Sequence, residues 1–214
     1  YVDVAQDTTL QMESERLRNS LLSAISHDLR TPLSVLVGLT ESLFLTQPPP
    51  PHQIAEIGHS IRREALRINA QVTNLLDMAR LQAGKIQLNR QWQPVDEVVG
   101  SALRALGNTL ADHALHVDIS SNLPLIEIDS VLMERVLCNL LENAAKYTPP
   151  GSTVEIRAIT RQGNVELSVE DNGPGIPEAE RELVFQPFYR ALGTNVDGSG
   201  LGLAIVREIA ERHA

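Results

Sequence analysis

The stretch SAISHDLRTPLSV, residues 23–35, decides the first half of the fold, because polar groups interrupt what is otherwise a helical pattern. His27, Asp28 and Arg30 stand close together, and Pro32 follows, although proline costs a helix interior about 3 kcal/mol. Around them apolar residues recur at alternating steps of three and four, at Leu22, Ile25, Leu29, Pro32, Leu36, Leu39 and Leu43. This spacing is typical of the seam of a coiled coil or helical bundle.

A second helical pattern follows the proline-rich stretch QPPPPH, residues 47–52, which should end the first helix. Its apolar positions run Ile54, Ile57, Ile61, Ala65, Ile68, Val72, Leu75 and Ala79, and Gly84 is a plausible C-terminal cap. We therefore predict an antiparallel helical hairpin over residues 1–86. Since two helices leave an apolar seam in water, we expect a homodimer that forms a four-helix bundle. Packing of the hairpin against its own second domain is the alternative.

Composition excludes several other classes of protein. Hydrophobic residues make up 43% of the chain, enough for a core, and the net charge of -9 argues against nucleic acid or an anionic membrane as the main partner. Cys138 is the single cysteine, so an intrachain disulfide is impossible. No apolar run approaches the roughly 18 residues that span a bilayer. We interpret the chain, which starts without Met, as a fragment of a longer protein.

Residues 87–214 mix strand and helix patterns. The stretches IQLNRQW, HVDIS and LIEID predict strands, and helices are predicted from Pro94 to about Leu110, over residues 130–146 and from about Gly202. TVEIRAIT and NVELSVED alternate in polarity around RQG, which predicts a hairpin. We therefore expect an α/β sandwich domain over residues 87–214, with a mixed sheet covered by helices on one face. The protein as a whole would be multi-domain, α then α+β.

The heptad places His27 at the solvent-exposed f position. Asp28 could accept the proton on Nδ1 of His27 and leave Nε2 as a nucleophile. Thr31 lies one turn further along the same face. Pro32 removes the hydrogen bond to the Asp28 carbonyl, which predicts a kink beside His27. A surface histidine is more often inert, and Thr31 could instead support the helix by bonding the His27 carbonyl.

A polar face is predicted on the helix of residues 130–146. Asn139 and Asn143 are four residues apart and share this face with Tyr147, with Lys146 beside it. Two neutral amides can bind Mg²⁺ through oxygen, and the lysine can neutralise a phosphate. An ordinary capped core helix would show the same pattern.

Two glycine-rich stretches follow. In DNGPGI, residues 171–176, the Asp171 carboxylate stands beside Gly173 and Gly175, which suits a flat base with an exocyclic amine, although Asp-Asn-Gly is also common in turns. In DGSGLGLAIV, residues 197–206, three glycines, Gly198, Gly200 and Gly202, lead into a helix whose N-terminus can bind phosphate. The intervening FQPFYR, residues 185–190, could equally be an aromatic plug of the core.

The order of these motifs resembles the catalytic core of the sensor histidine kinases of two-component systems. The stretches LRNSLLSAISHDLRTPLSVL and ERVLCNLLENAAKYTPPGS, with NLLDMARLQAGKIQL and EVVGSAL between them, are most similar to the branch that controls high-affinity potassium uptake. The resemblance implies a phosphoacceptor hairpin joined to an ATP-binding sandwich of the gyrase and chaperone type. Family members continue with a further strand pair, so we expect an incomplete sheet edge.

The resemblance also implies the roles of the candidate residues. His27 would attack the γ-phosphorus of ATP with Asp28 as general base, and Asn139 and Asn143 would hold Mg²⁺. Asp171 would accept a hydrogen bond from the adenine amine. The rest of the cofactor site would comprise Lys146, Tyr147, Gly173, Gly175, Ile176, Phe185, Phe188, Arg190, Gly198, Gly200, Leu201 and Gly202, with residues 191–199 as a lid.

The partner implied by the resemblance is a response regulator, which would receive the phosphoryl group on an Asp and be dephosphorylated at the same helix face, where Thr31 lies. A membrane and sensor part would precede this cytoplasmic portion of a bacterial inner-membrane protein. Two other functions stay open at this point: a non-catalytic nucleotide-binding scaffold, and a gyrase- or chaperone-type ATPase that does not label itself.

Overall fold

The structure is a computed structural model that describes residues 29–44, 49–82, 88–190 and 198–213. The chain divides into two compact units, Tyr1–Leu75 and Leu76–Ala214. The division falls within a long helix, earlier than residue 86. A domain boundary after residue 86 therefore stays a prediction.

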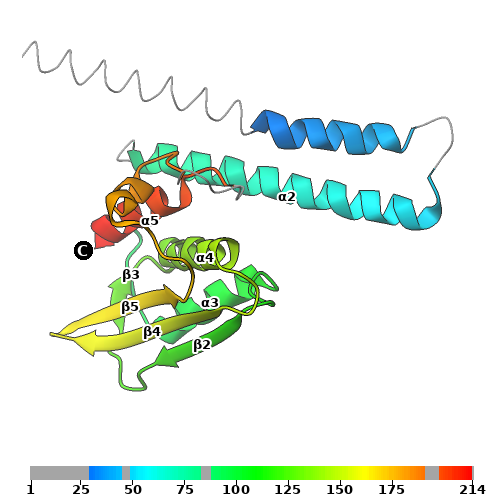
Figure 1. Cartoon of the computed structure of the whole chain (residues 1–214). Helices are drawn as coiled ribbons and strands as arrows, with labels where there is room; N and C mark the ends of the chain where they lie inside the picture. The colour runs from blue at the N-terminus through cyan, green and yellow to red at the C-terminus, as the bar shows by residue number, and fades with distance from the viewer. Residues whose placement is uncertain (1–28, 45–48, 83–87, 191–197, 214) are drawn as a thin grey trace, which may run out of the picture. The chain divides into compact units, whose positions relative to one another are not determined.

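The first unit contains most of the predicted helical hairpin. A helix covers residues 29–42, and α2 spans Pro51–Gln82. Figure 1 shows the two helices side by side and antiparallel. α2 begins at a proline because the first turn of a helix needs no backbone N–H bond. Among the described residues, the five predicted seam positions are all buried or half-buried, namely Leu29, Pro32, Leu36, Leu39 and Leu43. The heptad prediction for this helix is therefore confirmed.

Pro32 lies inside the helix and its side chain is fully buried. The ring occupies a seam position, where burial of apolar surface offsets part of the cost of the missing hydrogen bond. Two residues on, the Ser34 hydroxyl donates to the carbonyl of Arg30 at 2.9 Å. The expected kink depends on His27 and Asp28, which lie outside the described residues.

In the second unit, α3 spans Val95–Leu106 and buries Val95, Val98, Val99, Ala102 and Leu106 on one face. Our prediction that this helix runs to about Leu110 was wrong. Gly107 has a φ of 53° and its N–H bonds the Arg104 carbonyl, so the chain leaves the helix there. Glycine adopts this left-handed conformation without a steric penalty, which makes it a common C-terminal stop.

Five strands form two sheets in the described part of the chain. β1 (Gln91–Gln93) pairs antiparallel with β3 (Ile126–Ile128). β2 (Ala114–Ile119) runs parallel to β4 (Thr153–Arg161), which pairs antiparallel with β5 (Asn164–Asp171). The mixed sheet is thus confirmed, in the order β2-β4-β5, and β1 and β3 pair separately from it.

The hairpin between β4 and β5 turns at Gln162 and Gly163, whose φ angles are 52° and 84°. Two successive left-handed residues give a turn whose twist matches the strands that flank it. The hairpin predicted around RQG is therefore confirmed, and it fixes which side chains share each face of the sheet.

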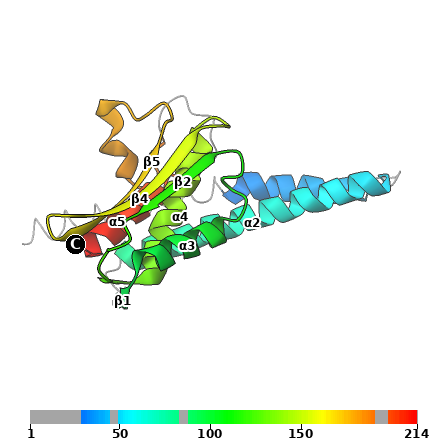
Figure 2. The same cartoon turned by 90° about the horizontal axis from the view of Figure 1, so that it is seen from below.

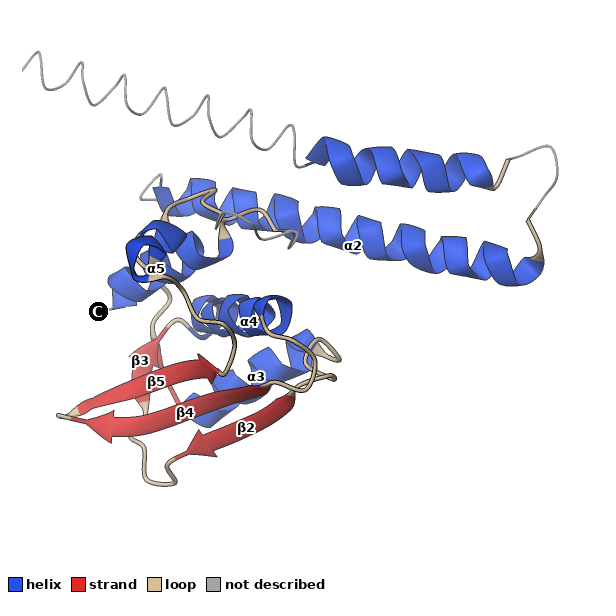
Figure 3. Cartoon of the chain, in the orientation of Figure 1, coloured by secondary structure: helices blue, strands red, loops and turns tan. Residues whose placement is uncertain are grey.

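Helices cover one face of the larger sheet, as Figures 2 and 3 show for α3 and α4 (Ser130–Tyr147). Val154, Ile156 and Ala158 of β4 are buried against them, and alternate residues of β5 pack on the same core. On the opposite face Arg157 forms ion pairs with Glu155 and Asp118. One face of the sheet therefore packs against helices and the other carries charged side chains, which is the arrangement predicted for the sandwich.

The segment just before β1 is bonded to the start of α4 and to the end of α5. Asp129 caps α4 by accepting from the Leu132 N–H at 3.1 Å, and its other carboxylate oxygen accepts from the Asn89 N–H at 3.0 Å. The backbone N–H of Asp129 donates to His213 Nε2 at the end of α5 (Gly202–His213). Arg90 also donates to the carbonyl of Arg212 at 2.6 Å. α5 is therefore held at its C-terminal end by Arg90, just before β1, and by the N-cap residue of α4.

None of the helices that the structure describes is long and apolar enough to cross a membrane.

Candidate nucleotide-binding site

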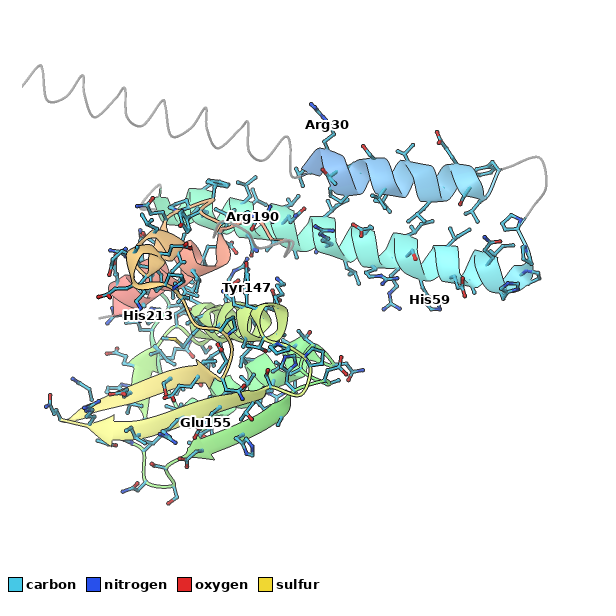
Figure 4. All side chains as sticks on the ribbon, in the orientation of Figure 1. Arg30, His59, Tyr147, Glu155, Arg190 and His213 are labelled. Carbon is cyan, nitrogen blue, oxygen red and sulfur yellow. The ribbon has the colours of Figure 1, made fainter. Side chains whose placement is uncertain are left out.

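The predicted polar face of α4 lies along one continuous helix that includes Asn139, Asn143, Lys146 and Tyr147. Asn139 is buried and Asn143 is half-buried, whereas Lys146 and Tyr147 are exposed at the C-terminal end of the helix (Figure 4). Nζ of Lys146 lies 3.4 Å from a carboxylate oxygen of Glu142, one turn back. This exposed pair is weak, so the lysine can exchange it for a phosphate.

Asn139 lies directly against the start of α5. A Cβ on Gly202 would be 3.3 Å from Oδ1 of Asn139, so the glycine allows the helix to approach the amide. Nδ2 of Asn139 is buried and has no hydrogen-bond partner among the described residues. Since buried donors are nearly always paired, the amide is arranged for a group that these residues do not supply.

The same residues fit Mg²⁺ held jointly with phosphates. The described residues contain no group of three or more His, Cys, Asp or Glu that could hold a metal ion by themselves. Mg²⁺ commonly takes few protein ligands and completes its shell with phosphate and water. The amide oxygens of Asn139 and Asn143 match that chemistry.

Asp171 and Gly173 form a tight turn at the end of β5. Oδ1 of Asp171 accepts from the Gly173 N–H at 2.8 Å, which leaves Oδ2 available. A Cβ on Gly173 would lie 2.7 Å from Oδ1 of Asp171 and 2.7 Å from Cγ2 of Thr148. Any larger residue would have to displace one of these two side chains, and glycine instead leaves bare backbone beside the second carboxylate oxygen, as a flat base with an exocyclic amine requires.

Beyond this turn the chain continues through Gly175 and Ile176. Gly175 has a φ of 72°, and the side chain of Ile176 is exposed. The carbonyl of Ile176 accepts from Nε of Arg181 at 3.3 Å, just after the short helix η1 (Glu178–Glu180). An exposed apolar side chain next to the Asp171 turn is available to contact a base.

A second turn joins the aromatic stretch to the start of α5. Phe185 ends the short helix η2 (Leu183–Phe185) and is half-buried, as is Phe188. The Phe188 N–H donates to the Gly200 carbonyl at 2.9 Å, and Leu201 after it is buried. A Cβ on Gly200 would lie 2.8 Å from backbone atoms of Phe188 and Tyr189. The backbone pairing thus holds the aromatic stretch beside the N-terminus of α5.

Arg190 and Gly198 lie at the two ends of the segment 191–197, which is outside the described residues. Arg190 is exposed and Gly198 is half-buried. The predicted lid therefore stays a prediction.

The catalytic candidates belong to the first unit. His27 and Asp28 lie outside the described residues, and Thr31 is an exposed residue of the helix 29–42. Exposure of Thr31 agrees with the face assigned to it by the heptad. The pairing of His27 with Asp28 stays a prediction.

Thr148 is a site residue that sequence reasoning missed. It ends α4, its hydroxyl donates to the Ala144 carbonyl at 2.7 Å, and its methyl group lies against Gly173. A threonine directly after a polar helix and before a proline was the available signal, because such residues often cap helices through the side chain.

Comparison with known proteins gives two family matches. Residues 17–84 match the His Kinase A (phospho-acceptor) domain, and residues 128–214 match the family described as histidine kinase-, DNA gyrase B-, and HSP90-like ATPase. The first match contains His27 and Thr31, and the second contains the nucleotide-site candidates.

Individual relatives agree with the family matches. The chain is 43% identical to the sensor protein KdpD of Escherichia coli over 97% of its own length, but spans only 23% of that protein. It is 36% identical to a solved structure of the mycobacterial sensor histidine kinase MprB, covering 58% of this chain and 80% of that one, with a TM-score of 0.52. The full-length structure of ShkA in complex with AMPPNP is 26% identical, covering 90% of this chain and 40% of that one, with a TM-score of 0.64.

Proposed function

Because this chain belongs to the sensor histidine kinases, we propose that it is an ATP-dependent protein-histidine kinase core that phosphorylates itself on His27. The observation that carries the proposal is the arrangement of the second unit. A buried amide of Asn139 with an unsatisfied donor lies against the glycine that opens α5. A helix N-terminus at that point favours the negative charge of phosphates.

ATP and Mg²⁺ are the proposed cofactors. The complex of ShkA with AMPPNP, an ATP analogue, supports a nucleotide at the matching unit of this chain. Asn139 and Asn143 would hold the metal ion, Lys146 would contact phosphate and Asp171 would accept from the adenine amine. Bound Mg²⁺ would neutralise phosphate charge, and the protein would contribute positioning and electrostatic stabilisation.

The proposed nucleophile is Nε2 of His27. Its lone pair forms a bond to the γ-phosphorus while the bond from that phosphorus to the bridging oxygen of ADP breaks. Asp28 accepts a hydrogen bond from Nδ1–H and stabilises the positive charge that develops on the ring. The phosphoryl group then passes to an Asp of a response regulator.

We further propose that the chain acts as a homodimer and also dephosphorylates the regulator, with Thr31 aligning the attacking water. The full protein would be an inner-membrane sensor of which this chain is a cytoplasmic portion. Similarity to KdpD supports assignment to the potassium-uptake branch.

The test is incubation of the full chain with γ-labelled ATP and Mg²⁺. Acid-labile, base-stable label should appear on the wild type and be absent from His27→Gln, which should still bind nucleotide. His59→Gln is the matched control, since His59 is an exposed histidine of α2 in the same unit (Figure 4). Continuous phosphate release without label would favour a gyrase-type ATPase. Nucleotide binding with neither label nor release would favour a scaffold.

A further inference from the structure

His113 lies just before β2 and bonds to the end of α4. Its Nε2 is 2.8 Å from the hydroxyl oxygen of Thr148, across 35 positions of sequence. The same hydroxyl lies 2.7 Å from the Ala144 carbonyl. The bond to His113 adds a second partner to the Thr148 hydroxyl.

The direction of these bonds follows from the donors available. A carbonyl can only accept, so the Thr148 hydroxyl donates its one proton to Ala144. Nε2 of His113 must then carry a proton and donate to the hydroxyl oxygen. Nδ1 of His113 is buried, and no hydrogen-bond partner for it lies among the described residues. The bond to Thr148 therefore places a proton on Nε2 and fixes the orientation of the imidazole.

Two hydrogen bonds on one hydroxyl fix the rotamer of Thr148, and with it the position of the methyl group. Cγ2 of Thr148 is one of the two atoms that a Cβ on Gly173 would approach to 2.7 Å. The other is Oδ1 of Asp171, which is bonded to the Gly173 N–H. A rotation of Thr148 would therefore disturb the turn that sets the direction of the Asp171 carboxylate.

The backbone around His113 is held independently of its side chain. The Gly151 N–H donates to the Asp112 carbonyl at 2.6 Å, and the Ala114 N–H donates to the Ser152 carbonyl at 2.9 Å. These bonds bracket His113 on both sides. Loss of the imidazole should therefore leave the strand in place while Thr148 keeps only its hydroxyl bond to Ala144 and gains freedom to change rotamer.

We propose that His113 is a positioning residue for the nucleotide base, which acts through Thr148 to hold the Gly173 turn and aim the Asp171 carboxylate. The inference rests on the proposed nucleotide site. It predicts that removing the donor weakens recognition of the 6-amino group of adenine more than it weakens binding of the phosphates.

The experiment compares the affinities of the full chain for ADP and for the diphosphate of purine riboside, which lacks the 6-amino group, by calorimetry. His113→Leu removes the donor, and His113→Gln keeps an N–H that can reach Thr148. Thr148→Val removes the hydroxyl but keeps the branched shape. His113→Leu should reduce the preference for ADP by about fivefold, the typical value of one hydrogen bond. His113→Gln should restore most of it.

Thr148→Val should lose the preference to the same degree, and the double variant should lose no more, because both changes break one chain of contacts. If His113→Leu and Thr148→Val lower the unfolding temperature but keep the full preference, the pair has only a structural role and the inference is wrong. If His113→Leu does not fold, the preference of Thr148→Val for ADP over the purine riboside diphosphate tests the inference by itself. If the wild type binds ADP and the purine riboside diphosphate equally well, Asp171 does not recognise the adenine amine. The inference about His113 would then fail together with that proposed role.

Discussion

The backbone of Phe188 pairs with that of Gly200, and both residues are left-handed, with φ angles of 67° and 65°. A bulky residue with positive φ costs about 1–2 kcal/mol, so the pairing persists because the surrounding turn enforces it. The strain lies where the aromatic stretch meets the N-terminus of α5.

Gly200→Ala should destabilise the second unit by about 2 kcal/mol or more, because a Cβ would meet backbone atoms 2.8 Å away at a left-handed residue. Thermal unfolding measures the effect. Gly198→Ala is the control, since a Cβ there meets no atom of the described residues within 4 Å. Equal unfolding temperatures for the two variants would contradict the account of this turn.

Asp171→Asn should weaken ATP binding by roughly 5- to 150-fold, the loss expected when the bound base covers one polar group that has no partner. The single amide oxygen of the asparagine would stay bonded to the Gly173 N–H, so its NH₂ group would face the adenine amine, and two donors would meet. Calorimetry measures the affinity.

Glu170→Gln makes the same chemical change one residue earlier, on the opposite face of β5. It should leave ATP affinity close to that of the wild type. If both variants bind ATP alike, Asp171 does not contact the base.

Leu29→Asp should break the proposed dimer, because it places a charge in the apolar seam. Sedimentation of the full chain at micromolar concentration measures the assembly. Val37→Asp is the control, because Val37 is more than half exposed and lies away from the seam positions. A wild type that sediments as a folded monomer would rule out the four-helix bundle.

Thr31→Ala separates the two activities proposed for one helix face. His27 needs no water as a nucleophile, so its phosphorylation should be nearly normal. Dephosphorylation of the regulator should fall strongly, because an aligned water is worth several kcal/mol. Both rates are measured on one preparation. Parallel losses with a lower unfolding temperature would mean that Thr31 only supports the helix.

We expect the raised pKa of the Cys138 thiol to lower the free energy of unfolding at alkaline pH. Burial, followed by the nearby charge of Glu134, raises its pKa from 9.0 to about 11. The unfolded chain loses the thiol proton first, so the free energy of unfolding falls as the pH rises from 9.0 to about 11. Cys138→Ala should reduce this fall, measured by urea unfolding across that pH window. An unchanged pH dependence in the variant would contradict the raised pKa.

Local patterns were enough to predict α4, the hairpin of β4 and β5 and the buried seam of the first helix, because period and turn chemistry act over a few residues. The separate pairing of β1 with β3 was not predictable in this way. The contact between His113 and Thr148 joins residues 35 positions apart. The left-handed φ of Phe188 arises from closure of a turn onto Gly200, which no property of phenylalanine indicates. Asp171 and Gly173 were predictable because their contact is made within two residues.

The bonds from Asn89 to Asp129, from Arg90 to Arg212 and from Asp129 to His213 connect the segment before β1, the N-cap of α4 and the last turn of α5. The last turn of α5 therefore opens only when its bonds to the other two segments break. These three segments, far apart in the sequence, should unfold together as one cooperative group.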